Sequence, residues 1–160
     1  MDVESYFLRY AMPCAFIIRD MGEITDAELK ELEDAAEANK PLPRKKLEKI
    51  FFRAFEKIGR FCKTIGKDKW DRETIERYFK EYHNKEIDRH EGYYATCGEM
   101  NRNLSKVRVG KIIKVEKDRY IVEYENDGKH ETRAVFSKLV PRCEVGEKVY
   151  IHFFFATEKA

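Results

Sequence analysis

The chain lacks most of the signals that would assign a protein to a class at once. No Ser-His-Asp, paired-carboxylate or glycine-rich phosphate signature stands out, so we expect a non-catalytic protein that is not an enzyme. The longest apolar run, Ala11 to Ile18, is interrupted by Pro13 and is too short to span a bilayer. There is no C-x-x-C pair, so neither a zinc knuckle nor a redox motif is visible. The four cysteines lie far apart: Cys14, Cys62, Cys97 and Cys143.

Neither sign of charge dominates. The sequence has 32 Lys+Arg and 30 Asp+Glu residues and a formal net charge of +2. A general nucleic-acid binder is expected to be clearly basic, so this balance argues against that class. The start of the chain, Met1-Asp2-Val3-Glu4, also lacks the positive lead of a secretory signal. We therefore expect a cytoplasmic protein with reduced thiols and no membrane segment.

With 160 residues the chain has room for two small domains. Residues 1–92 have the apolar spacing of helices. We predict a short helix from Asp2 to Ala11 that Pro13 stops, and a helix from Asp26 to about Ala38 with Thr25 as its N-cap. These predictions make the first domain helical.

Two further helices are predicted before residue 92. Apolar residues recur at intervals of three and four from Leu47 to Ile65, which is typical of a helix buried on more than one side, and Gly66 ends it. Asp71 is an N-cap candidate for a helix running to about His90. Residues 93–105 have no period and several turn formers, which indicates a linker or an ordered crossover.

From Leu104 onward the apolar period changes from 3.6 to two, which indicates strands. The first strand is predicted to bend at Gly110, where a bulge or barrel corner is plausible, and Asn126-Asp127-Gly128 is typical of a tight hairpin turn. Several short strands joined by tight turns indicate a small closed barrel over residues 106–160. The predicted strands are Val107 to Val115, Tyr120 to Tyr124, Lys129 to Phe136 and Val145 to Ala156.

The last predicted strand carries a resemblance to a known family. Val145-Gly146-Glu147-Lys148-Val149-Tyr150-Ile151-His152-Phe153-Phe154-Phe155-Ala156 resembles the V-G-[DE/Q]-x-V-L-V-H-x-G-[FY]-A run of the HypC/HupF hydrogenase maturation chaperones. The resemblance covers about the last third of the chain and implies an OB-type barrel. The predicted fold class is therefore α+β, with an N-terminal helical domain followed by a small OB-like β-barrel.

The resemblance also implies a function. Members of that family help assemble the iron centre of nickel–iron hydrogenases by binding a partner maturation protein and the large-subunit precursor. They use the strand histidine, which corresponds to His152, and a cysteine directly after the initiator methionine, where this sequence has Asp2. The family glycine after the histidine is replaced by Phe154. Together these residues imply that the barrel binds a protein without carrying a metal fragment.

The candidate partner-binding residues are Tyr150, His152 and Phe154, because strand alternation places them on one face. An exposed aromatic face with a histidine lowers solubility unless it is covered by the chain's own helices, a partner or a ligand. His152 either bonds to a neighbouring backbone group or contacts a partner or metal. Cys14 has apolar neighbours and is expected to be a buried structural thiol.

We predict no metal site and no cofactor. His83, His90 and Cys97 are spaced too widely for local chelation. The favoured function is a protein-interaction or assembly module. The resemblance implies a role in the maturation of a nickel–iron hydrogenase-type metalloenzyme, with a maturation factor or a metalloenzyme precursor as the partner.

The alternative function is binding of single-stranded RNA, because OB-type barrels offer aromatic side chains for base stacking beside basic residues. The weak net charge counts against it. The residues that could serve are Tyr120, Tyr124, Tyr150 and Phe154 with Lys111, Lys114 and Arg119.

Overall fold

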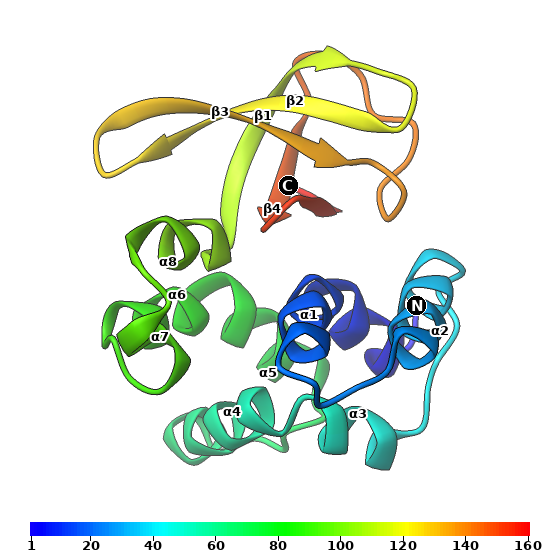
Figure 1. The fold of residues 1–160 in the computed structure, drawn as a ribbon, viewed down its shortest axis with the longest axis vertical. Coiled ribbons are helices and arrows are strands. Elements are labelled where there is room, and N and C mark those ends of the chain that lie inside the picture. The colour runs from blue at the N-terminus through cyan, green and yellow to red at the C-terminus, as the bar shows by residue number, and fades with distance from the viewer. The chain divides into compact units, whose positions relative to one another are not determined.

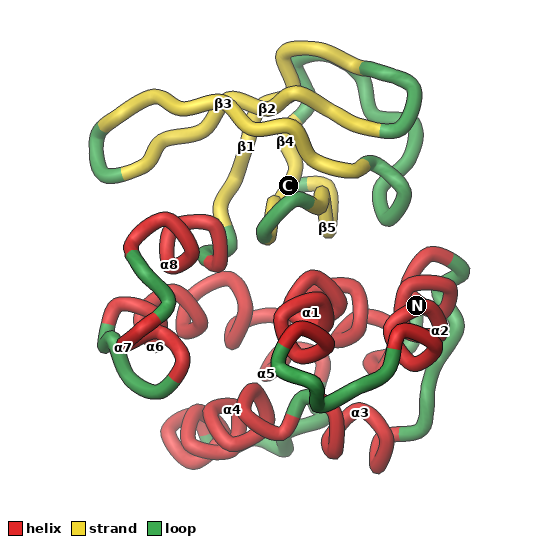
Figure 2. Tube along the Cα trace, in the orientation of Figure 1, coloured by secondary structure: helices red, strands yellow, loops and turns green.

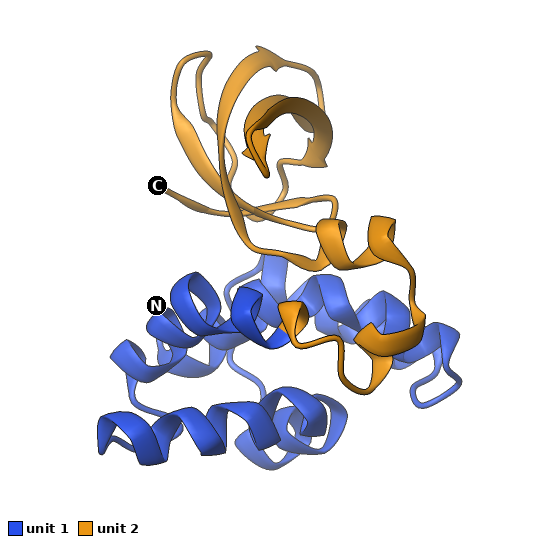
Figure 3. Cartoon of the chain, turned by 90° about the vertical axis from the view of Figure 1, so that its left-hand side faces the viewer, with its two compact units in different colours: residues 1–86 blue, residues 87–160 orange.

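The structure is a computed structural model that describes all residues from Met1 to Ala160. Its ribbon shows helices in the first part of the chain and strands in the last part (Figure 1). Colouring by secondary structure separates the same two classes of element (Figure 2). The chain divides into two compact units, Met1–Glu86 and Ile87–Ala160 (Figure 3). The predicted fold class is confirmed: the protein is α+β, with a helical domain followed by a small OB-like β-barrel.

The helical part contains six α-helices and one π-helix. No helix of the chain is both long enough and apolar enough to cross a membrane. The last three elements, over residues 72–88, follow one another without a break, so a single π-helical turn interrupts an otherwise α-helical segment. The elements are α1 (Val3–Asp20), α2 (Asp26–Glu37), α3 (Arg44–Ile50), α4 (Phe52–Ile65), α5 (Arg72–Arg77), the π-helix η1 (Tyr78–Tyr82) and α6 (His83–Asp88).

The prediction that Pro13 stops the first helix is wrong, because α1 continues to Asp20. Proline has no N–H and interrupts one bond of the helix ladder, at a cost of about 3 kcal/mol. On the C-terminal side of Pro13, however, Ala15 and Ile18 are buried, and Met12 is buried just before the proline. Burying a large apolar side chain contributes about 1.5–3 kcal/mol, so burial of the second half of the helix offsets the proline.

Three predicted helix ends are confirmed. Thr25 forms a capping box with Glu28, in which the hydroxyl accepts the Glu28 N–H and the Glu28 carboxylate accepts the Thr25 N–H. The Asp71 carboxylate accepts two backbone N–H groups at the start of α5. Gly66 ends α4 in the left-handed region, with φ of 67°. In each case a local side chain or a glycine satisfies the end of the helix, so sequence alone identified it.

The long helix predicted from Leu47 to Ile65 is divided at Phe51, whose φ and ψ of −99° and 37° are not helical. The ring of Phe51 is buried and lies 5.5 Å from the ring of Phe7, centroid to centroid. Phe7 also contacts the rings of Phe55 and Trp70. The aromatic stripe of this segment is therefore core, as its spacing predicts.

After the end of α6, the second unit contains two short helices in the segment expected to be a linker or crossover. The barrel follows, and its strands occupy most of the predicted segments. The elements are α7 (Tyr93–Thr96), α8 (Glu99–Ser105), β1 (Arg108–Val115), β2 (Arg119–Asn126), β3 (Lys129–Phe136), β4 (Lys148–His152) and β5 (Phe155–Lys159).

The strands close into a barrel in the order β1-β2-β3-β5-β4. Four of the strand pairs are antiparallel ladders. The fifth, between β3 and β5, is parallel and consists of one residue pair, Phe136 with Phe155. The barrel is therefore closed by a short seam between β3 and β5.

Gly110 lies where β1 passes close to β2. A β-carbon at this position would lie 3.0 Å from Cβ and 3.1 Å from Cγ2 of Val122, so any other residue would force the Val122 side chain to shift. The register shift of β1 falls between Ile112 and Lys114 and not at Gly110 itself. The predicted hairpin turn is confirmed, since Asp127 and Gly128 both have positive φ, of 50° and 79°.

The single strand predicted from Val145 to Ala156 is wrong. β4 ends at His152, the chain turns through Phe153 and Phe154, and β5 returns antiparallel to β4 from Phe155. Phe153 has a positive φ of 50°, which extended backbone does not allow. The segment is thus a hairpin, and its aromatic run supplies the turn.

Candidate functional site

The β4–β5 turn is held by three hydrogen bonds to distant parts of the same unit. The Phe153 N–H donates to the Leu104 carbonyl at 3.0 Å, and the Arg133 guanidinium donates to the Phe153 carbonyl at 2.9 Å. The Phe136 N–H donates to the Phe154 carbonyl at 2.7 Å. These bonds compensate for the positive φ of Phe153, which costs a non-glycine residue about 1–3 kcal/mol.

The structure places the three predicted site residues in different environments. Tyr150 is half-buried on β4, where it pairs with Val109 of β1. His152 is fully buried at the end of β4, with its ring 5.2 Å from that of Phe153. Phe154 lies on the turn and is 47% exposed. Tyr150 and His152 alternate along β4, but the strand ends at His152, so Phe154 does not share the common face that alternation predicts.

A second exposed aromatic residue, which the sequence did not single out, lies next to Phe154. Phe136 is 45% exposed, and its backbone N–H is the donor to Phe154. Its ring packs 5.3 Å from that of the buried Phe155. We call Phe136 and Phe154 the aromatic end of the barrel. The alternation of β3 would have placed Phe136 on the outer face with Ala134, and only the unpredicted turn brings Phe154 beside it.

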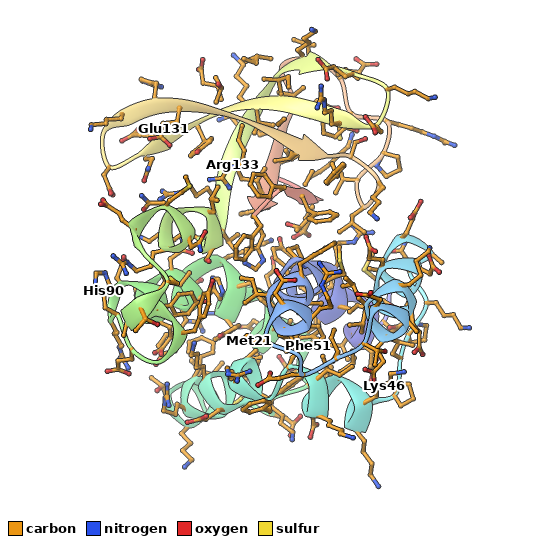
Figure 4. All side chains as sticks on the ribbon, in the orientation of Figure 1. Met21, Lys46, Phe51, His90, Glu131 and Arg133 are labelled. Carbon is orange, nitrogen blue, oxygen red and sulfur yellow. The ribbon has the colours of Figure 1, made fainter.

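A polar network is connected to the β4–β5 turn through Arg133. Figure 4 shows Arg133 and Glu131, both on β3. Arg133 donates to the hydroxyl of Tyr124 at 3.0 Å, and that hydroxyl donates to Glu131 at 3.0 Å. The hydrogen bond from Tyr124, another from Asn126 and the charges of Arg108 and Arg133 lower the pKa of the Glu131 carboxyl. Burial lowers the pKa of Arg133. The network fixes Arg133, and Arg133 in turn holds the Phe153 carbonyl.

Two of the four aromatics proposed for base stacking are inside the barrel. Tyr120 is buried, and its hydroxyl donates to the Val140 carbonyl at 2.7 Å and accepts the Cys143 N–H at 3.0 Å. Tyr124 is buried in the polar network described above. A base cannot stack on a ring that is already packed inside the barrel. Only Tyr150 and Phe154 of that set retain exposed surface.

Two of the basic residues proposed for RNA binding have their charges partly compensated by a neighbouring carboxylate. Glu116 forms ion pairs with Lys114, at 3.2 Å, and with Arg119. The outer face of β2 also carries two exposed carboxylates, Glu123 and Glu125. A phosphate backbone would meet these carboxylates on the strand that OB-type barrels use for oligonucleotides.

The cysteines and histidines form no metal-binding group. No cluster of three or more His, Cys, Asp or Glu side chains is arranged to hold a metal ion. All four cysteines are free. Burial raises the pKa of the Cys14 thiol to about 12, so this thiol is protonated at neutral pH, as expected for a structural cysteine. His83 is buried, whereas His90 is exposed.

Comparison of the chain with protein-family models, with curated proteins and with solved structures finds no match. The residues that can be assigned a role are therefore those that the fold itself brings together. These are the aromatic end, the buried His152 beneath its turn, and the Arg133 network that anchors it.

Proposed function

We propose that this protein is a non-catalytic interaction or assembly module whose barrel binds a protein partner at the aromatic end. The observation that carries the proposal is the β4–β5 turn, which exposes Phe154 while distant hydrogen bonds hold its backbone in place. Following the resemblance to the HypC/HupF chaperones, the partner is a maturation factor or a metalloenzyme precursor of the nickel–iron hydrogenase type.

Two exposed phenylalanines whose backbones are joined by a hydrogen bond support a protein partner. Aromatic residues are enriched at the centres of protein interfaces, and a few of them carry most of the binding energy. Because the hydrogen bonds between Phe136 and Phe154 and around Phe153 already order the backbone, binding costs little conformational entropy. The aromatic end therefore has the rigidity of a docking site.

His152 has a supporting role in this proposal. Its side chain is buried, so a partner contacts Phe154 and Phe136 while His152 packs beneath the turn against Phe153. Tyr150, half-buried two residues before His152 on β4, lies nearer the margin of such a contact. The histidine then determines the position of the turn and makes no direct contact with the partner.

A protein partner is favoured over single-stranded RNA by the burial of Tyr120 and Tyr124 and by the carboxylates on the outer face of β2. We also propose a cytoplasmic location, because four free cysteines suit a reducing compartment.

Replacement of Phe154 by alanine tests the proposal. The matched control is Phe52→Ala in the helical unit, since Phe52 has almost the same exposed fraction, 48% against 47%. Binding is measured by calorimetry with the purified hydrogenase maturation protein and large-subunit precursor encoded in the same genome. We expect Phe154→Ala to weaken binding by about thirtyfold, the effect of an interface hot spot, and Phe52→Ala to leave it unchanged.

Two outcomes would contradict the proposal. An equal loss of binding affinity in both variants would exclude the aromatic end as the binding site. Absence of binding of either protein to the wild type would exclude a hydrogenase-type partner. A parallel titration with single-stranded RNA at low salt would, if it showed tight and salt-sensitive binding, favour the alternative function.

A further inference from the structure

The aromatic end of the barrel is bordered by positive charge. Arg119 begins β2 directly opposite Phe136, and both side chains are exposed. Lys138 follows Phe136 by two residues, and its ammonium lies 5.6 Å from the centroid of the Phe155 ring. The Phe136 ring packs against the same Phe155 ring at 5.3 Å. Two cations therefore lie beside the exposed Phe136.

A single carboxylate compensates part of this charge. Glu116 forms ion pairs with Arg119 and, at 3.2 Å, with Lys114. Its side chain is 27% exposed, whereas those of Arg119 and Lys114 are 51% and 67% exposed. One negative charge is thus shared by two cations, and the cations are the more accessible to solvent. The three residues together present a net positive charge to an approaching molecule.

The turn before β2 adds one charge of each sign. Lys117 and Asp118 are both exposed. The Asp118 carbonyl accepts the Ser137 N–H at 3.0 Å, which holds this turn beside the end of β3. The segments that meet at the aromatic end, residues 114–119, 136–138 and 153–156, contain four cations and two carboxylates in all. The border of the aromatic end is therefore basic.

The charge on the outer face changes sign along β2. Beyond Arg119, the exposed charged residues of β2 are Glu123 and Glu125. Glu123 faces Lys111 of β1, but the partner of Glu125 on β3 is His130, which carries no permanent charge. A ligand with carboxylates at one end is oriented by such a pattern. A phosphate backbone, which is negative along its whole length, is repelled where it follows β2.

We infer that the partner bound at the aromatic end contacts it through an acidic segment, in which carboxylates flank an apolar side chain. The apolar side chain packs against Phe136 and Phe154, and the carboxylates face Arg119 and Lys138. This inference rests on the proposed function and names the chemistry of the partner. Opposite charges at the margin of an interface accelerate encounter and fix orientation more than they raise affinity. The basic border thus acts on the association rate and the phenylalanines on the dissociation rate.

Three synthetic peptides test the inference on the full-length protein. Each has the same leucine and phenylalanine anchor, flanked by two glutamates, two glutamines or two lysines. NMR titrations of the isotope-labelled protein follow the amides of Phe136 and Phe154 at about 0.1 M salt, where charges more than about 10 Å apart are screened. We expect the glutamate peptide to shift both amides and to bind about fivefold more tightly than the glutamine peptide. The lysine peptide should bind most weakly.

Lys117→Glu should abolish the preference for the glutamate peptide. The matched control is Lys129→Glu, which makes the same change of charge on another exposed lysine. Lys129 begins β3, about 20 Å from Phe136 along the strand, so this variant should keep the preference. With the purified maturation protein, Lys117→Glu should lower the association rate constant about threefold at 0.1 M salt and have no effect at about 1 M. Circular dichroism verifies that both variants are folded.

Equal affinity for the glutamate and glutamine peptides, or tighter binding of the lysine peptide, would overturn the acidic segment and leave the aromatic end as a binding site. Loss of the preference in Lys129→Glu as well would show a diffuse attraction to net charge and overturn the role of the border. A short oligouridylate that shifts the same amides at a lower concentration than the glutamate peptide would assign the border to nucleic acid.

The proposed docking site fails separately. If no peptide shifts the amides of Phe136 and Phe154 up to about 10 mM, both the aromatic end and the acidic segment are overturned. If the peptides bind as expected but the hydrogenase proteins do not, only the identity of the partner is overturned.

Discussion

Removal of one hydroxyl group, in Tyr120→Phe, should have a large effect on the barrel. The Tyr120 hydroxyl donates to the Val140 carbonyl at 2.7 Å and accepts the Cys143 N–H at 3.0 Å. All three residues are buried. The hydroxyl thus attaches the loop between β3 and β4 to β2, and phenylalanine preserves the packing of the ring while removing both bonds.

The magnitude follows from the two groups left behind. A buried donor or acceptor without a partner costs about 1–3 kcal/mol. Tyr120→Phe leaves the Cys143 N–H without a partner and the Val140 carbonyl with only the Cys143 thiol, 3.7 Å away, so we expect the free energy of unfolding of the barrel to fall by about 1–3 kcal/mol. This is a large share of the stability of a small domain, which is about 5–15 kcal/mol.

Native-state hydrogen exchange measures the change in the barrel alone. The amides of Val122 and Val135, inside the β2–β3 ladder, report opening of the barrel. The Cys143 amide should lose its protection locally, because its acceptor is the deleted hydroxyl. A decrease of less than about 0.5 kcal/mol at the ladder amides together with an unchanged Cys143 amide would refute the reasoning.

The same substitution has a signature at high pH. Burial raises the pKa of Tyr120 above its ordinary value of 10.0. The unfolded chain therefore loses this proton first, so the stability that Tyr120 contributes is present below pH 10 and is lost as the pH rises toward the folded pKa. We expect the difference in stability between wild type and Tyr120→Phe to shrink above pH 10, and a constant difference would contradict the assigned pKa direction.

Two further predictions concern packing and thiol chemistry. Gly110→Ala should destabilise the barrel by about 1–3 kcal/mol through overpacking against Val122, and the cost should be smaller in a Val122→Ala background. A double-mutant cycle by urea denaturation measures this coupling, and purely additive changes would show that the contact is not the cause. Because the Cys14 thiol has a pKa of about 12, iodoacetamide at pH 8 should modify it far more slowly than Cys62, which is less deeply buried. Equal rates in peptide mass spectrometry would contradict this.

Much of the barrel could be predicted because its signals are local. The turn at Asp127 and Gly128 needs residues that tolerate positive φ, and the sequence supplies them. The bounds of β3, Lys129–Phe136, follow from that turn and the alternation beyond it. Helix ends at Thr25 and Gly66 were predictable for the same reason, since the residue that satisfies each end lies next to it in the chain.

The candidate site could not be predicted because it depends on contacts that are distant in sequence. Nothing in the run Phe153-Phe154-Phe155 signals a turn, and its positive φ at Phe153 is compensated by Leu104 and Arg133. The exposure of Phe154 and the burial of His152 both follow from that turn. The continuation of α1 past Pro13 could not be predicted for a related reason, since packing of Ile18 overrides a local helix breaker.

The single residue pair between β3 and β5 has a consequence for how the barrel folds. The two hairpins β1–β2 and β2–β3 join residues near one another in sequence, whereas Arg108 must find Ile151 before β4 can add to β1. Closing so long a loop costs entropy before any contact compensates for it. We therefore expect the three-stranded meander to form early and the bond from Phe136 to Phe154 to form last, so the surface offered to a partner exists only in the completed barrel.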